Sequence, residues 1–244
     1  MRDTDLDWRR IAETDPYYGV STSEDYRLAN LDEEKKEQFY ENGVREISLT
    51  IDILKQLYGD FAANCALDFG CGVGRLTIPM ADHFEHVVGV DISPGMLDLA
   101  QERADKLKRS NVEFCSSPPD LSFDWINSFI VFQHIPPERG YLILSELLEK
   151  LGDGGLVSLH FFLFRNLEKL AHIELDWQFA RWDGQHLDCL IPAPATPPGS
   201  MRLYDYDLTR IFAILTQNGI TKMTLHHADH KWAHGARIFG RKSI

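Results

Sequence analysis

The residues best suited to chemistry stand together in one short stretch, residues 67–75, which reads LDFGCGVGR. An apolar run ends at Asp68, and glycines follow at positions 70, 72 and 74. Because glycine has no side chain beyond a hydrogen, it lets the backbone approach a ligand closely. The pattern therefore predicts a ligand-binding turn between a strand and a helix, with a carboxylate at its start.

The spacing of the glycines bears on which ligand this turn binds. A dinucleotide-binding turn has the pattern GxGxxG, and the helix after it faces a diphosphate. Here Gly74 comes one residue early, and Arg75 stands where the third glycine of that pattern belongs. Asp68 would repel a diphosphate, but it would attract a cation such as the sulfonium and ammonium groups of S-adenosylmethionine.

A second carboxylate follows at the end of the next apolar run. Asp91 lies in the stretch GVDIS, 21 positions after Gly70. A carboxylate at the end of a second strand accepts hydrogen bonds from ribose hydroxyls in dinucleotide sites. Alone it fits a dinucleotide and S-adenosylmethionine equally well, but together with DFGCGVG it favours S-adenosylmethionine.

The surrounding elements must hold these residues in place. Between residues 62 and 162, short apolar strands alternate with amphipathic helical stretches. The predicted strands are CALDF, VVGV, NVEFC, WINSFIVF and GLVSLHFF, and the predicted helices are RLTIPMADHF, SPGMLDLAQERADKLKR and PPERGYLILSELLEKLG. This alternation predicts a parallel sheet with helices on both faces. Ligands bind such a sheet beyond the carboxyl ends of its strands.

The remaining segments extend this core. Residues 1–60 are predicted to form a helical cover, and residues 61–244 the main domain, with an insertion at 163–206 that contains a short helix and a proline-rich loop. A helix over 207–219, capped by Asp207, precedes two hairpin strands. The expected fold class is α/β, a seven-stranded, mostly parallel, doubly wound sheet whose last strand is antiparallel.

Four stretches, LDFGCGVGRLT, GVDISPGML, SFIVFQHIP and LGDGGLVSL, resemble in order and spacing those of the class I S-adenosylmethionine-dependent methyltransferases. The resemblance covers roughly residues 62–162. It implies the fold of that family, S-adenosylmethionine as cofactor, and O- or N-methylation of a small molecule. Two alternatives stay open: a nicotinamide-dependent oxidoreductase, and a module that binds S-adenosylmethionine without catalysis.

The resemblance also implies roles for single residues. The cofactor contacts would be Asp68, Gly70, Cys71 and Gly72 at the methionine, Asp91 at the ribose, Ile92 and Met96 at the adenine, and the backbone of Phe129 at the amino group. Many relatives have an aspartate after the third strand, where this chain reads FCSSPPDL. Ser116 or Ser117 would replace it at the adenine, unless Asp120 folds back.

Three further positions carry alternative interpretations. Arg75 either binds the carboxylate of the cofactor or pairs with a protein carboxylate such as Asp91. His134 is either a general base or, as we favour, a neutral histidine that hydrogen-bonds a backbone carbonyl. The aromatic N-terminal segment either packs on the surface or closes over the cofactor, with Tyr17 or Tyr18 at the methionine end.

Aromatic and histidine residues suggest the walls of an acceptor site. The candidates for these walls are Phe162, Phe164, Trp177, Phe179, Trp182, Tyr204 and Tyr206, and at least half of the first five are expected to be core residues of the insertion. The C-terminal hairpin holds His226, His227, His230 and His234. Because no cysteine or cluster of carboxylates joins them, we predict a solvated turn or a pocket rim and no metal site.

Composition and charge narrow the class of partner. A length of 244 residues, with 44% hydrophobic and 25% charged, suits one globular domain with extensions. The net charge of −12 repels phosphate backbones, so no nucleic-acid partner is expected.

No apolar run approaches the length of a membrane span, and the polar start is unlike a signal peptide. Four cysteines without a CxxC motif predict reduced thiols and a cytoplasmic location. The oligomeric state is not predicted.

Overall fold

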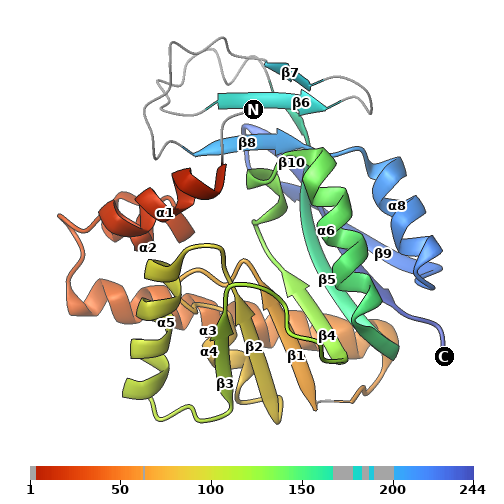
Figure 1. Cartoon of the computed structure of the whole chain (residues 1–244), viewed down its shortest axis with the longest axis horizontal. Helices are drawn as coiled ribbons and strands as arrows, with labels where there is room; N and C mark the ends of the chain where they lie inside the picture. The colour runs from red at the N-terminus through yellow and green to blue at the C-terminus, as the bar shows by residue number, and fades with distance from the viewer. Residues whose placement is uncertain (1–3, 63, 167–177, 183–186, 190–200) are drawn as a thin grey trace.

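A computed structural model describes the chain except residues 1–3, 63, 167–177, 183–186 and 190–200 (Figure 1). The helices are α1 (Thr4–Thr14), α2 (Pro16–Val20), α3 (Glu33–Tyr58), α4 (Thr77–Met80), α5 (Pro94–Lys106), α6 (Pro137–Glu149) and α8 (Leu208–Gln217), with short 3-10 turns η1 (Glu24–Tyr26) and η2 (Phe132–His134). The strands are β1 (Cys65–Phe69), β2 (His86–Val90), β3 (Val112–Cys115), β4 (Phe123–Ser128), β5 (Leu151–Arg165), β6 (Gln178–Trp182), β7 (Leu187–Cys189), β8 (Arg202–Asp205), β9 (Lys222–Asp229) and β10 (Ala233–Arg241).

The main sheet has seven strands in the order β3-β2-β1-β4-β5-β10-β9. The first five pair in parallel, and β10 runs antiparallel to both β5 and β9. The expected fold class is therefore confirmed, including the antiparallel last strand. The order reverses at β1 and β4, so the carboxyl ends of these two strands flank the position where open α/β sheets bind ligands.

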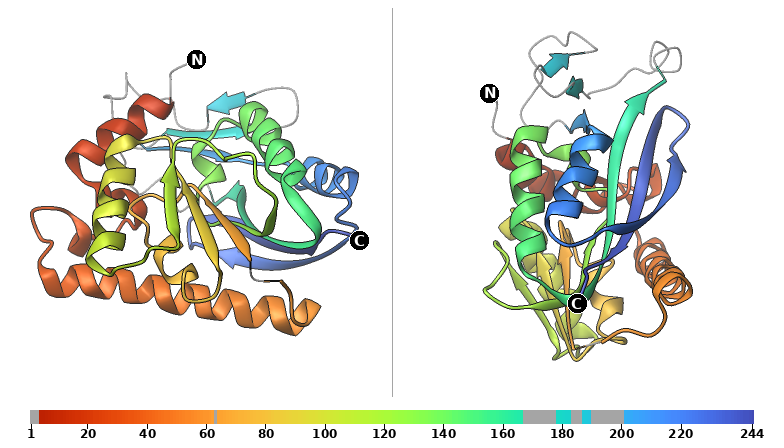
Figure 2. Two further views of the ribbon diagram at one scale, coloured as in Figure 1. Left: turned by 60° about the horizontal axis from the view of Figure 1, so that its bottom comes forward. Right: turned by 90° about the vertical axis from the view of Figure 1, so that its right-hand side faces the viewer.

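Helices cover the two faces of this sheet because successive strand residues point to opposite sides. Helices α6 and α8 lie on one face and α3 on the other (Figure 2). The apolar face of α3 packs against Trp125 and Phe239, whereas α6 and α8 pack against Leu67, Ile126 and Ile238 on the other side. Both faces of the central strands are thus buried, as their near-continuous apolar sequences predict.

Helix ends follow the capping residues closely. Asp32 caps α3 by accepting from the Lys35 N–H at 2.8 Å, and Asp207 caps α8 as predicted, with a 2.7 Å bond from the Thr209 N–H. The expected helix over 75–84 is wrong in length. Only Thr77–Met80 is helical, and Pro79, which has no N–H to donate, lies within this single turn.

Strand β4 ends earlier than predicted, at Ser128 rather than near residue 132. Ile130 has a φ of 59°, in the left-handed region that a β-branched residue rarely adopts. This conformation turns the chain out of the sheet and into the short η2 turn. The reversal places residues 129–135 directly over the carboxyl ends of β1 and β4.

The described part of the insertion forms a small second sheet of three strands, in the order β7-β6-β8. Strands, not a helix, therefore occupy its described residues, and the proline-rich loop lies outside them. This sheet and α1 sit beyond the carboxyl ends of the main strands (Figure 1). No helix in the described ranges is long and apolar enough to cross a membrane.

Candidate functional site

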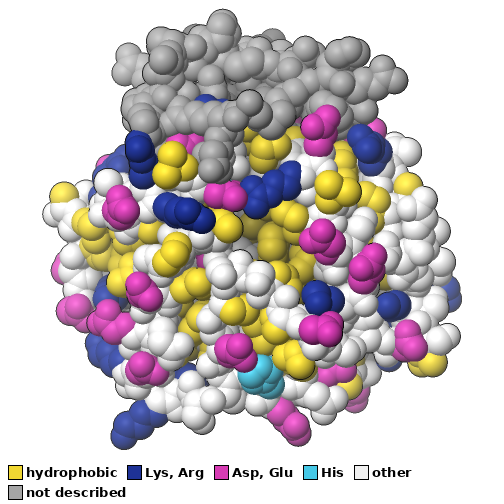
Figure 3. Space-filling view, in the orientation of Figure 1, with side chains coloured by type: hydrophobic (Ala, Val, Ile, Leu, Met, Phe, Trp, Pro, Cys, Tyr) yellow, Lys and Arg dark blue, Asp and Glu magenta, His cyan; other side chains and the backbone are white. Residues whose placement is uncertain are grey.

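A cavity of about 670 Å³ opens at the carboxyl ends of β1, β2, β3 and β4. This volume lies within the range of small-molecule and cofactor sites. Its walls come from α1, the glycine-rich turn, the end of β2, the residues after β3 and β4, and one side of α6. Hydrophobic side chains gather around the hollow on the face seen in Figure 3.

The glycine-rich turn needs its glycines for backbone reasons. Gly70, Gly72 and Gly74 have φ values of 77°, 53° and 77°, which side chains disfavour. A Cβ at Gly70 would also lie 2.3 Å from a methyl of Val131. The turn is fixed by the N–H groups of Gly70 and Cys71, which donate to the Val90 carbonyl at 2.7 and 2.9 Å. Gly70, Cys71 and Gly72 all line the cavity, and their contact with the methionine of a cofactor stays a prediction.

Asp91 lies at the end of β2 and lines the same cavity. One of its oxygens accepts from the Gly72 N–H and the other from the Ser93 N–H, both at 2.9 Å. Burial raises the pKa of Asp91, and these backbone bonds oppose that rise. Each carboxylate oxygen has a second lone pair. Asp91 can therefore hold the turn and still accept hydrogen bonds from a ligand.

Asp68 lies at the end of β1, where it is buried and lines the cavity. Its oxygens accept from the Thr77 hydroxyl at 2.6 Å and the Asn127 amide at 2.9 Å. Ser158 donates in turn to Asn127, at 2.7 Å. Burial raises the pKa of Asp68, whereas these two bonds lower it. Sequence reasoning missed Thr77 and Asn127. Thr77 could have been found from the sequence, because it places a hydroxyl nine positions after Asp68, on the first turn of the following helix.

The residues predicted to surround the adenine also line the cavity. They are Ile92, Met96, Ser116 and Ser117, and Phe129, whose backbone was predicted at the amino group, lines the cavity too. Asp120 does not fold back toward them, since its exposed carboxylate lies 3.6 Å from the Lys150 ammonium. Of the two alternatives for the missing aspartate, only the serines stand at the cavity.

Arg75 lines the cavity, its Nε has no hydrogen-bond partner, and no ion pair with Asp91 forms in the part of the chain that the structure describes. Its guanidinium lies 5.8 Å from the Phe39 ring centroid. Burial lowers the pKa of Arg75, while the nearby charges of Glu46 and Asp68 raise it. Pairing with Asp91 is therefore wrong, and a role toward a ligand stays a prediction.

The N-terminal segment does close over the cavity, but through residues other than Tyr18. Trp8 and the segment 19–22 line it, whereas neither Tyr17 nor Tyr18 does. The Tyr18 ring lies 3.7 Å below the Arg27 guanidinium, and Tyr17 is buried against Phe39. The prediction for Tyr18 is thus wrong, because the turn of α2 directs these rings toward α3 and η1.

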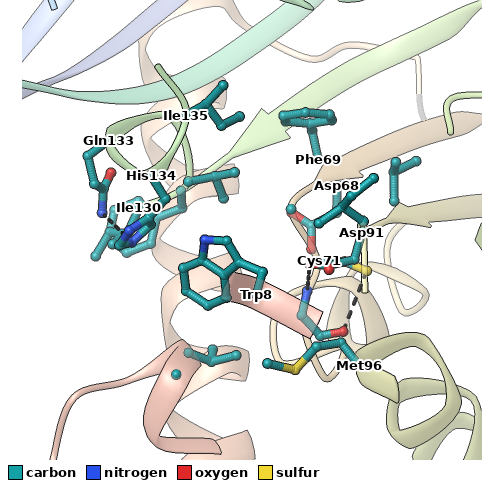
Figure 4. Close-up of a pocket in the computed structure, with 18 of the residues that line it drawn as sticks. Trp8, Asp68, Phe69, Cys71, Asp91, Met96, Ile130, Gln133, His134 and Ile135 are labelled. Carbon is teal, nitrogen blue, oxygen red and sulfur yellow. Dashed lines mark hydrogen bonds between the residues drawn. The ribbon is translucent and has the colours of Figure 1, made fainter. Parts of the chain in front are cut away.

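His134 is almost buried, and its Nδ1 lies 3.0 Å from the Arg202 carbonyl oxygen. Burial lowers the pKa of His134 to about 4, so the ring is neutral at pH 7. Trp8 contacts it edge-on, with 4.7 Å between ring centroids. The contact with a backbone carbonyl agrees with the favoured interpretation, and the role of His134 stays a prediction. Figure 4 shows His134 and Gln133 on one side of the pocket and Asp68 and Asp91 on the other.

The expected aromatic walls are only partly correct. Phe162 lines the cavity, but Phe164 stacks on His234 with 4.6 Å between ring centroids. Tyr204 and Tyr206 belong to the main core. Met201 and Leu203 face the cavity in their place, since alternate strand residues point to opposite sides. Trp177 and the side chains of Phe179 and Trp182 lie outside the described residues.

The hairpin histidines separate into two groups. His230 lines the cavity, and its Nε2 lies 3.1 Å from the Nε2 of buried His160. His227 and His234 form a hydrogen bond of 3.2 Å away from the cavity. No group of three or more histidine, cysteine or acidic residues that could hold a metal occurs within the described ranges. The interpretation of a pocket rim thus fits His230 alone.

Comparison with known proteins gives three findings. Residues 66–155 match the family model described as a methyltransferase domain, which confirms the resemblance inferred from sequence. Phosphoethanolamine N-methyltransferase 2 of Caenorhabditis elegans is 35% identical over 115 residues, 44% of this chain and 26% of that protein. A 23S rRNA (uracil(1939)-C(5))-methyltransferase of Vesicomyosocius okutanii is 29% identical over 116 residues, 46% of this chain and 26% of that protein. The chain thus spans about a quarter of the length of these curated relatives.

Among solved structures, magnesium protoporphyrin IX methyltransferase from Synechocystis PCC 6803, with bound S-adenosylhomocysteine, has a TM-score of 0.62. At 20% identity the likeness covers 93% of this chain and 98% of that one. The chain therefore has the class I methyltransferase fold over nearly its whole length.

Proposed function

We propose that the chain is an S-adenosylmethionine-dependent methyltransferase that acts on a small-molecule acceptor. The proposal rests on the contact between Asp91 and the glycine-rich turn at the cavity. There Asp91 accepts a hydrogen bond from the Gly72 N–H at 2.9 Å. The match of residues 66–155 to a methyltransferase domain supports it.

The residues at the cavity fit this cofactor. Asp91 keeps lone pairs for ribose hydroxyls, and Gly70 and Gly72 line the cavity beside it. Ile92 and Met96 offer apolar surfaces for a flat ring. Asp68 and Asp91 give that side of the cavity a negative potential, which favours a sulfonium and an ammonium group. A diphosphate would meet two carboxylates there, which disfavours the nicotinamide alternative.

When bound, S-adenosylmethionine supplies a methyl group already activated on sulfur. The protein then has to orient the acceptor and exclude water, which are positioning effects. Trp8 from α1 and Leu203 from β8 provide apolar walls for that purpose. At pH 7 neutral His134 shapes the wall beside them, and its pKa of about 4 makes it a weak base. An amine acceptor needs no base, whereas a hydroxyl acceptor would need one.

A small acceptor is supported by the position of the cavity and by charge. The cavity is bounded by α1 on one side and by residues of β8 on another, so it suits a molecule that enters between them. One curated relative acts on ribosomal RNA. The net charge of −12 disfavours such a polyanion here.

The test is binding followed by transfer. S-adenosylhomocysteine at about 100 times its dissociation constant should stabilise the fold by about 2.7 kcal/mol, measured by thermal melting and calorimetry. No shift with S-adenosylhomocysteine or S-adenosylmethionine, or a shift only with a nicotinamide dinucleotide, contradicts the proposal. Transfer of a labelled methyl group to a metabolite pool then separates an enzyme from a module that only binds.

A further inference from the structure

The side chain of Gln133 has no role in the cofactor contacts described above, yet it lines the cavity with only 1% of its surface exposed. Its Nε2 lies 3.4 Å from the Nε2 of His134. Its carbonyl oxygen Oε1 is buried and has no hydrogen-bond partner. Buried polar atoms in folded proteins are nearly always satisfied, so an orphaned one next to a cavity needs an explanation.

The orientation of the Gln133 amide follows from a short chain of hydrogen bonds. The Arg202 carbonyl can only accept, so His134 Nδ1, 3.0 Å away, must carry the hydrogen. In a neutral ring, Nε2 is then an acceptor, and the neighbouring group of Gln133 must be its NH₂. The oxygen of Gln133 is thereby turned away from His134. A flipped amide would bring two acceptors together.

Apolar residues line the same cavity as Gln133. Among them are Ile130, Ile135, Met201 and Leu203, and Trp8 packs on the neighbouring His134. In Figure 4, Gln133 and His134 lie across the pocket from Asp68 and Asp91. The Gln133 oxygen therefore stands on the side of the cavity opposite the proposed cofactor contacts, where an acceptor molecule would lie.

We propose that Gln133 is a specificity-determining residue whose carbonyl oxygen accepts a hydrogen bond from an N–H or O–H group of the methyl acceptor. The inference rests on the proposed function, since it assigns the opposite side of the cavity to the acceptor. His134 is the positioning residue, because it fixes the amide through its Nε2. The acceptor class is then a small molecule that combines an apolar body with at least one such donor.

The test uses pairs of fragments that match in shape but differ in the donor: indole against benzofuran, and phenol against fluorobenzene. Their binding to the full chain saturated with S-adenosylhomocysteine is measured by ligand-observed nuclear magnetic resonance. We expect the donor member of each pair to bind about tenfold more tightly. In Gln133→Met the preference should disappear, with the affinity for S-adenosylhomocysteine unchanged within about twofold. The matched variant Gln101→Met, at an exposed glutamine on α5, should keep the preference.

The wild-type comparison needs no variant, so it decides the proposal even if Gln133→Met fails to fold. Equal binding within each pair, including no binding by either member, overturns the role of Gln133 while the proposed function stands. A preference that persists in Gln133→Met overturns it equally. If S-adenosylhomocysteine itself does not bind, the proposed function fails, and this inference fails with it.

Discussion

Asp91 Oδ2 accepts a hydrogen bond from the Gly72 N–H at 2.9 Å, so the carboxylate proposed to hold the ribose also holds the glycine-rich turn. The other oxygen bonds the Ser93 N–H at the start of α5. One side chain thus joins the ends of two strands at the cavity. Its removal should affect both the ligand contact and the glycine-rich turn beside it.

Asp91→Ala should weaken the binding of S-adenosylhomocysteine by at least tenfold. Each hydrogen bond to a charged group contributes about 1.5–3 kcal/mol, and two ribose hydroxyls would lose theirs. Isothermal calorimetry measures the change. Asp98→Ala, at an exposed position on α5, is the control and should bind as the wild type does. Unchanged affinity in Asp91→Ala, with the fold intact, would remove the ribose assignment.

Gly70→Ala should destabilise the fold more than Gly154→Ala. Their φ values are 77° and 74°, so both variants carry a positive-φ backbone cost of about 1–2 kcal/mol. At Gly154 a new Cβ meets no atom closer than 3.6 Å, an ordinary contact distance, but at Gly70 it would lie 2.3 Å from Val131. Overpacking adds about 1–3 kcal/mol at Gly70. Chemical denaturation measures the difference, and equal losses in the two variants would contradict the close contact.

His160 should make the stability depend on pH. Burial lowers the pKa of His160 to about 3, so the ring stays neutral in the folded state at pH values where the unfolded chain binds a proton. The contribution of His160 to the free energy of unfolding is complete above the unfolded pKa of about 6.5 and is lost as the pH falls toward 3. By pH 4.5 the loss should reach about 2–3 kcal/mol.

His160→Phe keeps an aromatic ring that cannot be protonated, so the fall in stability between pH 7 and pH 4.5 should shrink by that amount. Urea unfolding at the two pH values measures it, and the difference between the variants isolates His160 from the carboxylates that titrate in the same range. The exposed His83 serves as the control, since His83→Phe should leave the slope as it is. Parallel pH profiles for wild type and His160→Phe would show that His160 does not contribute.

Arg237→Met should weaken the attachment of α3 to the sheet. The Arg237 guanidinium on β10 binds Glu46 and, at 2.6 Å, the Thr50 hydroxyl, both on α3. Loss of one partner of a largely buried pair should cost about 2–3 kcal/mol. Arg45→Met breaks an exposed pair with Glu41 on the same helix and should cost less than about 1 kcal/mol. Guanidinium denaturation of both variants measures the contrast, and similar costs would argue against the anchoring role.

The sequence alone was enough for the fold class and for the residues that form the core of the proposed cofactor site. The hydrophobic periodicity of strands and helices, and the residue types that form a turn, are properties of short stretches of sequence. The turn from Asp68 to Gly74 and the position of Asp91 at a strand end could therefore be predicted from the sequence. Asp207 at the start of α8 is another such local signal, because a cap bonds to backbone groups within its own first turn.

The tertiary structure decided which side chains meet across elements. Asn127 bonds Asp68 because β4 lies beside β1 in one particular register, and no local pattern specifies that register. Trp8 reaches the cavity while Tyr18 turns away, which depends on how α1 and α2 dock. Leu203 faces the cavity and Tyr204 faces the core. Side chains alternate between the two faces of a strand, and the packing of β8 decides which face turns toward the cavity. Gln133 and His134 are adjacent in the sequence, but the sequence does not show how the Gln133 amide is oriented. The Arg202 carbonyl, 68 positions along the chain from His134, fixes the orientation of the His134 ring. That ring in turn holds the NH₂ of Gln133 and leaves its oxygen to accept a hydrogen bond from a ligand.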